Sequence, residues 1–441
     1  MKPWTAALAL ATGLFLPALA MAAPVLMISI DGLRPLDVIE ADKRGFEAPN
    51  LRRMMGEGSY ATGVRNALPT VTYPNHTTLI TGVWPAKHGV ANNTAFDPER
   101  KNLGGWYWYA TDIKVPTLWD AVHGAGGKTA SLGWPVSVDA PSIDYDIPEY
   151  WRAKLPEDLK LVHALSTRGL PEALKAASGV GLADIFSTKP AADVAKGRMA
   201  AAVYALHKPA FMTLHLSSLD ETEHATGPGS AESKADLKLI DQVIGELVAA
   251  ARQAEPDLVV VVVSDHGFAP VEHEVNLVGA FADAGLITTD PQTHKVTAWE
   301  AAPWGGASAA VVLRNPADEA VKAKVKALLD KLAADPEYGI NRIADAAEIA
   351  RMGGTPLASY WVDFKIGYMM GGSMTHISAA DEKGTHGWFP DHPEMRASFF
   401  VQGPGVPRKG SIGEIDQRDI APTVARILSV SLPTADGKPL F

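Results

Sequence analysis

The sequence of 441 residues contains no cysteine. Disulfide bonds and thiolate metal sites are therefore excluded, so the fold must depend on its buried core, and any metal ion must be held by nitrogen and oxygen ligands. The sequence also lacks a basic run: 40 Lys and Arg face 50 Asp and Glu, a formal net charge of −10. We do not expect such a chain to bind a nucleic-acid scaffold, although bound metal ions could attract a small phosphorylated substrate.

Long apolar segments are scarce as well. The apolar run at the N-terminus, Ala6–Leu19, is shorter than the roughly 20 residues that a membrane-spanning helix needs. Lys2 precedes this run and small residues follow it at positions 20–23, an arrangement typical of a secretory signal. We expect residues 1–23 to be a signal peptide, cleaved on export to the periplasm or the medium, and the mature chain to have no stable membrane span. An N-terminal membrane anchor is the alternative.

The remainder has the composition of a globular enzyme, 47% hydrophobic and 20% charged. Short Val- and Ile-rich runs alternate with segments of helical periodicity, a pattern that predicts an α/β fold with a mostly parallel central sheet and helices on both faces. We expect residues 24–441 to form a single catalytic domain with a smaller lobe inserted at about 268–380. The aromatic-rich segment 99–160 is expected to be a second insertion outside the core. The predicted strands are 25–30, 211–216, 257–263 and 398–401, and the predicted helices are 237–253, 317–334 and 420–428.

Ionisable residues follow two of the predicted strands directly. Asp31 comes after strand 25–30, and Asp265 and His266 come after the valine-rich strand 257–263. Ligands of open α/β sheets bind at the carboxyl ends of the strands, and charged groups beside a buried strand are costly unless they are paired or bind a metal ion. These residues are therefore candidate metal ligands. A capping aspartate with an incidental histidine is the alternative for the pair.

Three further candidates for metal binding lie elsewhere in the chain. Asp220 and His224 are four residues apart, which places both side chains on one face of a helical turn. The sequence Thr226-Gly227-Pro228-Gly229 that follows indicates a loop or a short turn. His386 lies in a glycine-flanked segment that could approach a ligand closely. Each of the three could equally be an ordinary surface or packing residue.

Thr72 lies between Pro69 and Pro74, which predicts a locked turn. Its hydroxyl becomes a useful nucleophile only when a base or a metal ion activates it, and no Ser-His-Asp arrangement lies nearby in the sequence. Asn93 offers an amide that could donate a hydrogen bond to a phosphoryl oxygen. For each residue, an ordinary surface turn is the alternative.

Taken together, these motifs resemble the nucleotide pyrophosphatase/phosphodiesterase family of the alkaline phosphatase superfamily. The resemblance covers nearly the whole predicted mature chain. Its most specific segments are Ile30-Asp31-Gly32, Thr70-Val71-Thr72-Tyr73-Pro74-Asn75-His76, Ser264-Asp265-His266-Gly267 and Gly384-Thr385-His386-Gly387.

The resemblance implies an alkaline-phosphatase-like fold and two zinc ions per chain. It implies that Thr72 is the nucleophile and forms a covalent phosphothreonine intermediate between the two ions. It further implies the following roles: Asp31, Asp265, His266 and Thr72 bind one zinc; Asp220, His224 and His386 bind the other; Asn93 holds a phosphoryl oxygen; and Tyr73 packs against the leaving group or base of the substrate.

The substrate class depends on charge near the nucleophile. Phosphomonoesterases of this superfamily use cationic groups to bind the additional anionic oxygens of a monoester, and the nearest cations in the sequence are Arg34 and Arg65. Phosphodiesters and pyrophosphates of nucleotide type are therefore the predicted substrates. The alternatives are a phosphomonoesterase, a phosphonate hydrolase, a choline-phosphate phosphodiesterase, or a binding protein that has lost catalysis and whose aromatic run 106–109 contacts a base, a cation or a lipid headgroup.

Overall fold

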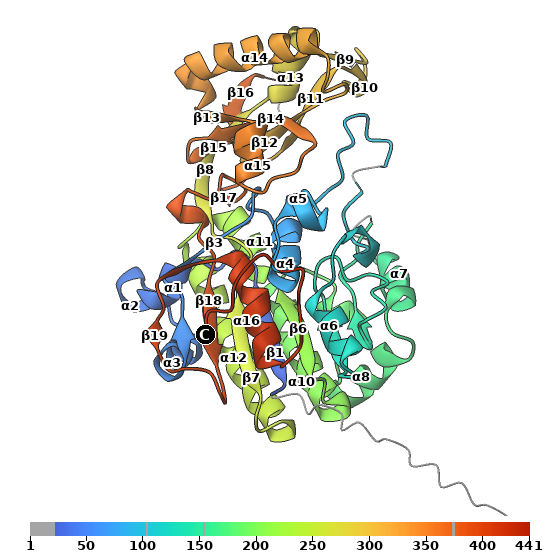
Figure 1. Cartoon of the computed structure of the whole chain (residues 1–441), viewed down its shortest axis with the longest axis vertical. Helices are drawn as coiled ribbons and strands as arrows, with labels where there is room; N and C mark the ends of the chain where they lie inside the picture. Colours follow the sequence, from blue (N-terminus) through green and yellow to red (C-terminus); the bar gives the residue numbers. More distant parts are fainter. Residues whose placement is uncertain (1–22, 103–104, 153–154, 373–374) are drawn as a thin grey trace, which may run out of the picture.

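The computed structural model describes residues 23–102, 105–152, 155–372 and 375–441. The predicted signal peptide, residues 1–23, lies outside these ranges apart from its last residue. An eight-stranded sheet forms the centre of the molecule (Figure 1). Its strands, in spatial order, are β19 (Gly410–Ser411), β2 (Ser59–Tyr60), β18 (Phe399–Gln402), β7 (Val259–Val263), β1 (Val25–Ile30), β6 (Phe211–Leu216), β4 (Thr129–Leu132) and β5 (Tyr145–Ile147).

Most strand pairs of this sheet are parallel, which confirms the predicted sheet type. β1 pairs in parallel with both β6 and β7, and β4 pairs in parallel with β6 and β5. The segment 398–401, which the apolar pattern placed among buried parallel strands, instead pairs antiparallel with β7 as β18. Strand direction depends on the connection that precedes the strand, so the apolar run alone did not reveal it.

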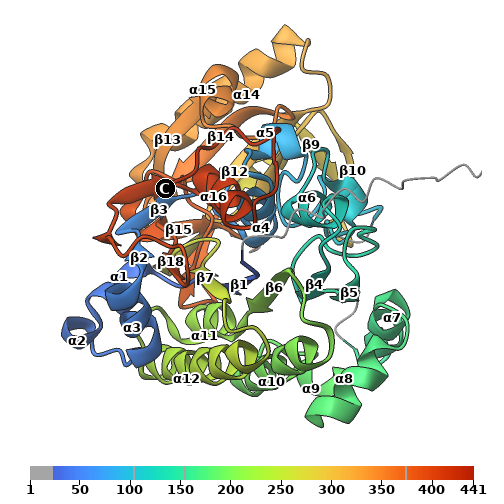
Figure 2. The same ribbon diagram turned by 60° about the horizontal axis from the view of Figure 1, so that its bottom comes forward.

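Helices cover both faces of the sheet, as the prediction required (Figure 2). The side chains of β1 alternate between two cores because successive residues of a strand point to opposite faces. Leu26 and Ile28 pack with helices α3 (Pro49–Glu57), α10 (Pro190–His207) and α12 (Ala231–Ala254). Val25 and Met27 belong to the core shared with α4 (Thr72–Thr81), α6 (Leu118–Gly124) and α16 (Ile420–Ile427). Among the described residues, none of the helices has the length and apolar character needed to cross a membrane.

The aromatic-rich segment 99–160 is not a separate insertion, contrary to the sequence prediction. It contributes strands β4 and β5 to the central sheet. Trp119 and Trp134 are almost fully buried in the core shared with α4, α6 and α16. These strands are only four and three residues long, too short for the alternation of side chains to identify them as strands.

The chain between β7 and β18 builds a second group of strands at the top of Figure 1. Strand β8 (Ala269–Val275) leads into it, and a four-stranded antiparallel sheet follows, with α13 (Leu277–Asp283) and α14 (Glu319–Ala334) in the same region. Leu277, Phe281 and Leu329 belong to a core of its own. The domain boundaries inferred from the sequence stay a prediction. The strands of the sheet are β11 (Ala301–Gly305), β12 (Ser308–Leu313), β14 (Ala358–Phe364) and β13 (Ile340–Asp345).

Candidate metal centre and nucleophile

The carboxyl ends of β1 and β7 place three candidate ligands together. The two strands are neighbours, with Ser29 paired to Val263, so Asp31 and Asp265 follow adjacent strands at equal distances along the chain. The next residue, His266, directs its Nε2 atom between the two carboxylates, 3.3 Å from Asp31 Oδ1 and 3.1 Å from Asp265 Oδ2. Gly32, whose φ is +73°, turns the chain immediately after Asp31 and donates its amide to Asp265 Oδ1 at 3.3 Å.

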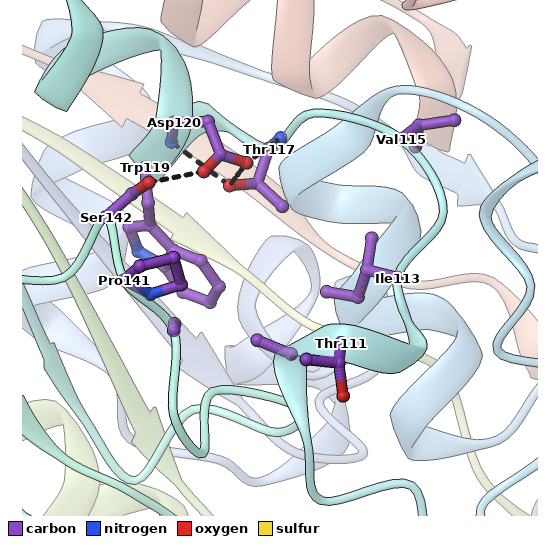
Figure 3. A pocket seen from close by; sticks show the side chains of 10 residues that line it. Thr111, Ile113, Val115, Thr117, Trp119, Asp120, Pro141 and Ser142 are labelled. Carbon is purple, nitrogen blue, oxygen red and sulfur yellow. Dashed lines mark hydrogen bonds between the residues drawn. The ribbon is translucent and has the colours of Figure 1, made fainter.

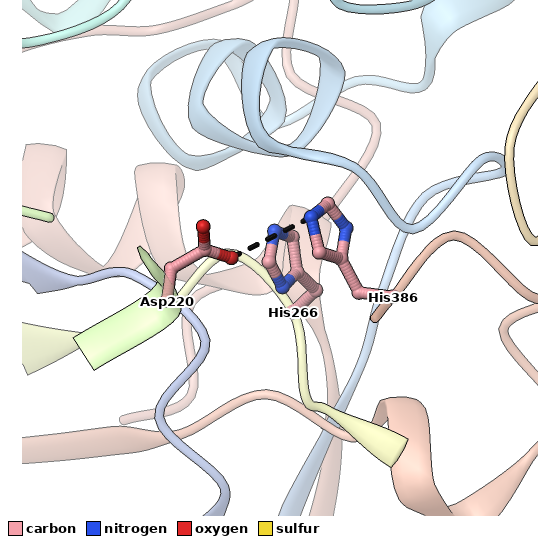
Figure 4. Close-up of side chains that lie close together, drawn as sticks. All are labelled: Asp220, His266 and His386. Atoms are coloured by element: carbon pink, nitrogen blue, oxygen red, sulfur yellow. Dashed lines mark ion pairs between the residues drawn. The ribbon is translucent and has the colours of Figure 1, made fainter. Parts of the chain in front are cut away.

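A second group of candidate ligands lies beside the first. Asp220 and His224 lie on helix α11 (Ser218–Thr226), where His224 Nε2 is 3.4 Å from Asp220 Oδ2. His386 follows β17 (Gly384–Thr385), and its Nε2 atom is 3.5 Å from Asp220 Oδ1. Figure 4 shows Asp220, His266 and His386 meeting from three separate segments of the chain.

Helix α11 corrects the prediction of a loop or short turn at Asp220. The glycine-rich sequence 226–229 was a helix end and not the centre of a loop, since Gly227 at φ +88° caps a helix of nine residues. The helix keeps Asp220 and His224 on one face, as their spacing of four residues predicted.

Each of the three candidate histidines has a backbone carbonyl as partner for its Nδ1 atom. The carbonyl oxygens belong to Gly384 for His224, at 3.0 Å, Gly267 for His266, at 3.1 Å, and Thr70 for His386, at 3.0 Å. A carbonyl oxygen can only accept, so Nδ1 is the donor in each ring. In the neutral rings, Nε2 then carries the free lone pair and faces the carboxylates, the arrangement found in metal-ligating histidines.

Three buried carboxylate oxygens of the site have no hydrogen-bond partner among the described residues: Asp31 Oδ1, Asp220 Oδ1 and Asp265 Oδ2. Each faces the Nε2 atom of a histidine at 3.1–3.5 Å. Buried, unpaired carboxylate oxygens are costly, and a cation between oxygen and nitrogen would satisfy both. Two overlapping groups have ligand atoms that all lie within 4.8 Å of one another and could hold a metal ion. They are Asp31, Asp265 and His266, and Asp220, His266 and His386.

The pKa shifts of these residues also indicate that the site has an excess of negative charge. Burial and the charges of Asp265 and Asp220 raise the pKa of Asp31 well above its usual value. Burial alone would lower the pKa of His266, but the neighbouring carboxylates, Asp265 first, outweigh it and raise that pKa to about 9. For His386, burial and the charge of His266 prevail and lower the pKa to about 3. A divalent cation would relieve the repulsion among the carboxylates.

Thr72 is the first residue of helix α4 and does not lie in an isolated turn, contrary to the sequence prediction. Pro74 is compatible with a helix here because its missing N–H falls in the first turn, where amides have no partner within the helix. The Thr72 Oγ1 atom lies 3.5 Å from His266 Nε2. Because Thr72 begins α4, the positive end of the helix dipole lies beside its hydroxyl, where it would stabilise a developing anion.

Asn93 and Tyr73 are tied to the start of α4. The Tyr73 amide donates to Asn93 Oδ1 at 2.9 Å, which leaves Nδ2 as the donor group of Asn93. The Tyr73 ring is fully buried and packs edge-on against Trp106, with 5.1 Å between ring centroids. Trp106 packs in turn against Trp151 at 5.2 Å. The predicted contact between Tyr73 and substrate stays a prediction.

Two residues of the site, Glu149 and His215, were not predicted from the sequence. His215 Nε2 lies 3.1 Å from Asp31 Oδ2, and Glu149 accepts a hydrogen bond from the Tyr73 hydroxyl at 2.7 Å. His215 had a usable signal, because it is an ionisable residue within the apolar run Phe211–Leu216. Glu149 had none, because an acidic residue after a proline is common in exposed loops.

A cavity of about 250 Å³ elsewhere in the molecule lies between η1 (Ala110–Asp112) and the start of α6 (Figure 3). Its one acidic lining residue, Asp120, is fully engaged: Oδ2 accepts from the Thr117 amide at 2.8 Å, and Oδ1 accepts from the Ser142 hydroxyl. These bonds cap α6. Asp120 therefore has a structural role, and none of the candidate catalytic residues lines the cavity.

The family model for type I phosphodiesterase/nucleotide pyrophosphatase matches residues 25–388. The chain belongs to this family. Ectonucleotide pyrophosphatase/phosphodiesterase family member 1 of Rattus norvegicus is 24% identical over 255 residues, which cover 55% of this chain and 24% of the relative. A venom phosphodiesterase of Macrovipera lebetinus is 24% identical over 258 residues, covering 55% of this chain and 25% of the relative. The chain thus spans about a quarter of the length of these curated relatives.

Solved structures show the same fold. An inactive variant of murine ectonucleotide pyrophosphatase/phosphodiesterase 5, in complex with AMP, has a TM-score of 0.65 at 18% sequence identity, with 94% of this chain and 97% of that chain covered. The human protein of the same name has a TM-score of 0.64 with the same identity and coverage. These similarities confirm the alkaline-phosphatase-like α/β fold predicted from the sequence.

Proposed function

We propose that the protein is an exported, zinc-dependent phosphodiesterase that hydrolyses phosphodiester or pyrophosphate bonds of nucleotide-type substrates, with Thr72 as the nucleophile. The observation that carries the proposal is the position of Thr72 Oγ1, at the N-terminus of α4 and 3.5 Å from His266 Nε2 in the carboxylate–histidine cluster. Membership of the family supports it. Export is supported by the names of the relatives, which are ectoenzymes and venom enzymes.

The candidate ligands fit two zinc ions, since their donors are carboxylates, imidazoles and the Thr72 hydroxyl. When bound, zinc would lower the pKa of the attacking hydroxyl and neutralise charge that develops on the phosphoryl oxygens. Asp31, Asp265, His266 and Thr72 would hold one ion, and Asp220, His224 and His386 would hold the other.

The residues of the chain divide the chemical work. Thr72 Oγ1 loses its proton and forms a bond to phosphorus while the bond from phosphorus to the leaving oxygen breaks, and the leaving oxygen takes up a proton, giving a phosphothreonine. Water then attacks phosphorus and loses a proton while the bond to Oγ1 breaks, and Oγ1 takes up a proton, which restores the hydroxyl. Asn93 Nδ2 donates a hydrogen bond to a phosphoryl oxygen, since Oδ1 is engaged by the Tyr73 amide. The buried Tyr73 ring supports Trp106, whose partly exposed indole suits a nucleobase.

Diesters are favoured over monoesters because the nearby arginines are committed or remote. Arg34 Nη2 lies 2.7 Å from Asp37 and 3.7 Å from Glu223. The Arg65 side chain is exposed to solvent at the end of β3 (Gly63–Arg65). Neither is placed to neutralise the additional negative charge of a monoester.

Hydrolysis of 4-nitrophenyl thymidine 5′-phosphate by the zinc-loaded protein tests the proposal. We expect activity in the wild type, loss of turnover in Thr72→Ala, and retained turnover in Thr72→Ser, which keeps the hydroxyl. A fully zinc-loaded wild type without detectable diesterase activity would refute the proposal. A higher rate on 4-nitrophenyl phosphate than on the diester would favour a phosphomonoesterase instead.

A further inference from the structure

His215 connects the metal-binding cluster to a residue outside it. Its side chain, on strand β6, is 2% exposed. Nε2 lies 3.1 Å from Asp31 Oδ2, and Nδ1 lies 2.9 Å from Glu149 Oε2 and 3.1 Å from the carbonyl oxygen of Gly133. All three acceptors are oxygen atoms, so the ring is held from both sides and has a single orientation.

Glu149 joins this histidine to the residue beside the nucleophile. While Oε2 faces His215, Oε1 accepts a hydrogen bond from the Tyr73 hydroxyl at 2.7 Å. The four side chains Tyr73, Glu149, His215 and Asp31 therefore form one hydrogen-bonded chain. Tyr73 and Asp31 are buried and the Glu149 side chain is 12% exposed, so water competes little for these bonds.

The consequence for Asp31 concerns which of its oxygens can bind a metal ion. Oδ2 is occupied by His215, whereas Oδ1 has no hydrogen-bond partner among the described residues and faces His266 Nε2 at 3.3 Å. A buried carboxylate on β14, Asp363, makes a useful comparison. Asp363 has partners on both oxygens: Oδ2 lies 2.8 Å from His392 Nε2, and Oδ1 accepts from the Phe389 amide at 3.1 Å. Asp363 is thus a fully satisfied structural carboxylate, whereas Asp31 keeps one oxygen for a cation.

We propose that Glu149 and His215 are positioning residues that hold Asp31 as a metal ligand through one oxygen and hold Tyr73 beside the nucleophile. His215 acts on Asp31 alone, Glu149 acts on both ends of the chain, and Tyr73 is the end on the substrate side. The part concerning Tyr73 rests on the proposed phosphodiesterase function. The part concerning Asp31 does not, because metal binding can be measured without a substrate.

The geometry of the imidazole ring supplies a precise test at His215. An asparagine amide reaches about as far as Nδ1 and so loses the contact with Asp31, whereas a glutamine amide reaches about as far as Nε2 and can keep it. We expect His215→Asn to weaken binding of one zinc ion by about 10- to 100-fold, the usual effect of removing a partner of a metal ligand. His215→Gln should restore most of the affinity. Competition between the metal-free protein and a chromogenic zinc chelator measures both.

His392→Asn is the matched control, because it removes an Nε2 contact to the buried carboxylate of Asp363, which is not a candidate ligand and also accepts hydrogen bonds from the Phe389 amide and Asn341 Nδ2. Its zinc affinity should stay within about twofold of the wild type, although its thermal stability falls. Equal zinc affinities in His215→Asn, His392→Asn and the wild type would overturn the proposal for Asp31. Near-UV circular dichroism checks the fold. If His215→Asn does not fold, Glu149→Gln replaces it, because this substitution preserves the shape of the side chain. We expect Glu149→Gln to weaken zinc binding in the same assay. A wild-type zinc affinity in Glu149→Gln would overturn the proposal.

Tyr73→Phe tests the other end of the chain. It removes the hydroxyl that binds Glu149 and leaves the bond between His215 and Asp31 in place. We expect a several-fold fall in kcat/KM on the thymidine diester with zinc affinity unchanged, whereas Glu149→Gln should lower both. Unchanged diester kinetics in Tyr73→Phe and Glu149→Gln, beside an active wild type, would overturn this part. A wild type inactive on the diester would refute the proposed function and leave the zinc result standing.

Discussion

The imidazole rings of His266 and His386 stack face to face, with 3.6 Å between centroids and 10° between planes. His266 comes from the end of a sheet strand and His386 from the segment that follows the second group of strands, so the stack joins the two halves of the candidate metal centre. In the metal-free protein the two rings differ in charge at neutral pH. The carboxylates raise the pKa of His266 to about 9, and burial beside His266 lowers that of His386 to about 3.

Zinc binding should therefore release protons. The pKa of His266 is about 9 and that of His224, raised by Asp220 and Glu382 against the effect of burial, is about 11, so both rings hold a proton at pH 7 that a metal ligand must lose. We expect the apparent zinc affinity to rise between pH 6 and pH 9, by about tenfold per pH unit for each proton released. Calorimetry in buffers of different ionisation enthalpy counts the protons. An affinity independent of pH over this range would contradict the assignment of these ligands.

Asn93→Asp should separate the two functions of the Asn93 amide. The aspartate keeps an acceptor for the Tyr73 amide but loses the Nδ2 donor. We expect kcat on the diester to fall by about 10²- to 10³-fold, as on removal of one oxyanion donor, with little change in the melting temperature. Asn93→Ala should lose the same activity and also some stability. An Asn93→Asp variant with wild-type kcat would exclude Asn93 from transition-state stabilisation.

His88 should make the protein sensitive to acid independently of the metal centre. Burial lowers its pKa to about 3, and its ring contacts the Thr78 hydroxyl at 3.2 Å. Below the unfolded pKa of about 6.5 the unfolded chain binds a proton that the native ring refuses, so this stabilising contribution is present above pH 6.5 and is lost as the pH falls toward 3. The slope is about 1.4 kcal/mol per pH unit for one such group.

Urea unfolding at several pH values compares the wild type with His88→Gln, which cannot be protonated. The variant should lose less stability between pH 6.5 and pH 4 than the wild type does. His123→Gln is the control, because that side chain is 45% exposed, and it should follow the wild type. Parallel curves for His88→Gln and the wild type would show that His88 is not the titrating group.

Gly82→Ala should destabilise the end of α4, the helix that begins with Thr72. Gly82 caps this helix at φ +70°, and an added Cβ would lie 2.8 Å from the Ala435 side chain. Gly179, which caps α8 (Leu170–Ser178) at φ +75°, has no atom within 4 Å of an added Cβ. Gly179→Ala should lower the free energy of unfolding only by the backbone strain, about 1 kcal/mol. Gly82→Ala should lower it by more. Equal losses in thermal unfolding would show that the contact with Ala435 relaxes freely.

The sequence predicted those parts of the site that local pattern determines. Asp31, Asp265 and His266 were identified because each follows a continuous apolar strand, and strand ends are where a parallel sheet binds ligands. Strand 25–30 and helix 420–428 matched β1 and α16 almost to the residue. The strand is marked by a nearly unbroken apolar run that ends at Asp31, and the helix by apolar residues at helical spacing.

The remainder depends on contacts between distant segments. Glu149 belongs to the site only because the fold places His215 of β6 beside it, and no local sequence pattern predicts that contact. Thr72 was assigned to a turn because two prolines flank it, but the second proline falls within the first turn of a helix, where it is tolerated. The segment 99–160 was assigned outside the core because its strands are too short to show alternation.

The pairing of β1 with β7 also bears on the order in which the protein assembles. Asp31 and Asp265 take their separation from one strand spacing, about 4.8 Å, so that half of the centre is defined once β1 and β7 have paired. His386 lies near the other end of the sequence and reaches its place only after the chain between β7 and β18 has been made and folded. A chain still being synthesised could therefore offer one half of the centre to metal ions before it could offer the other.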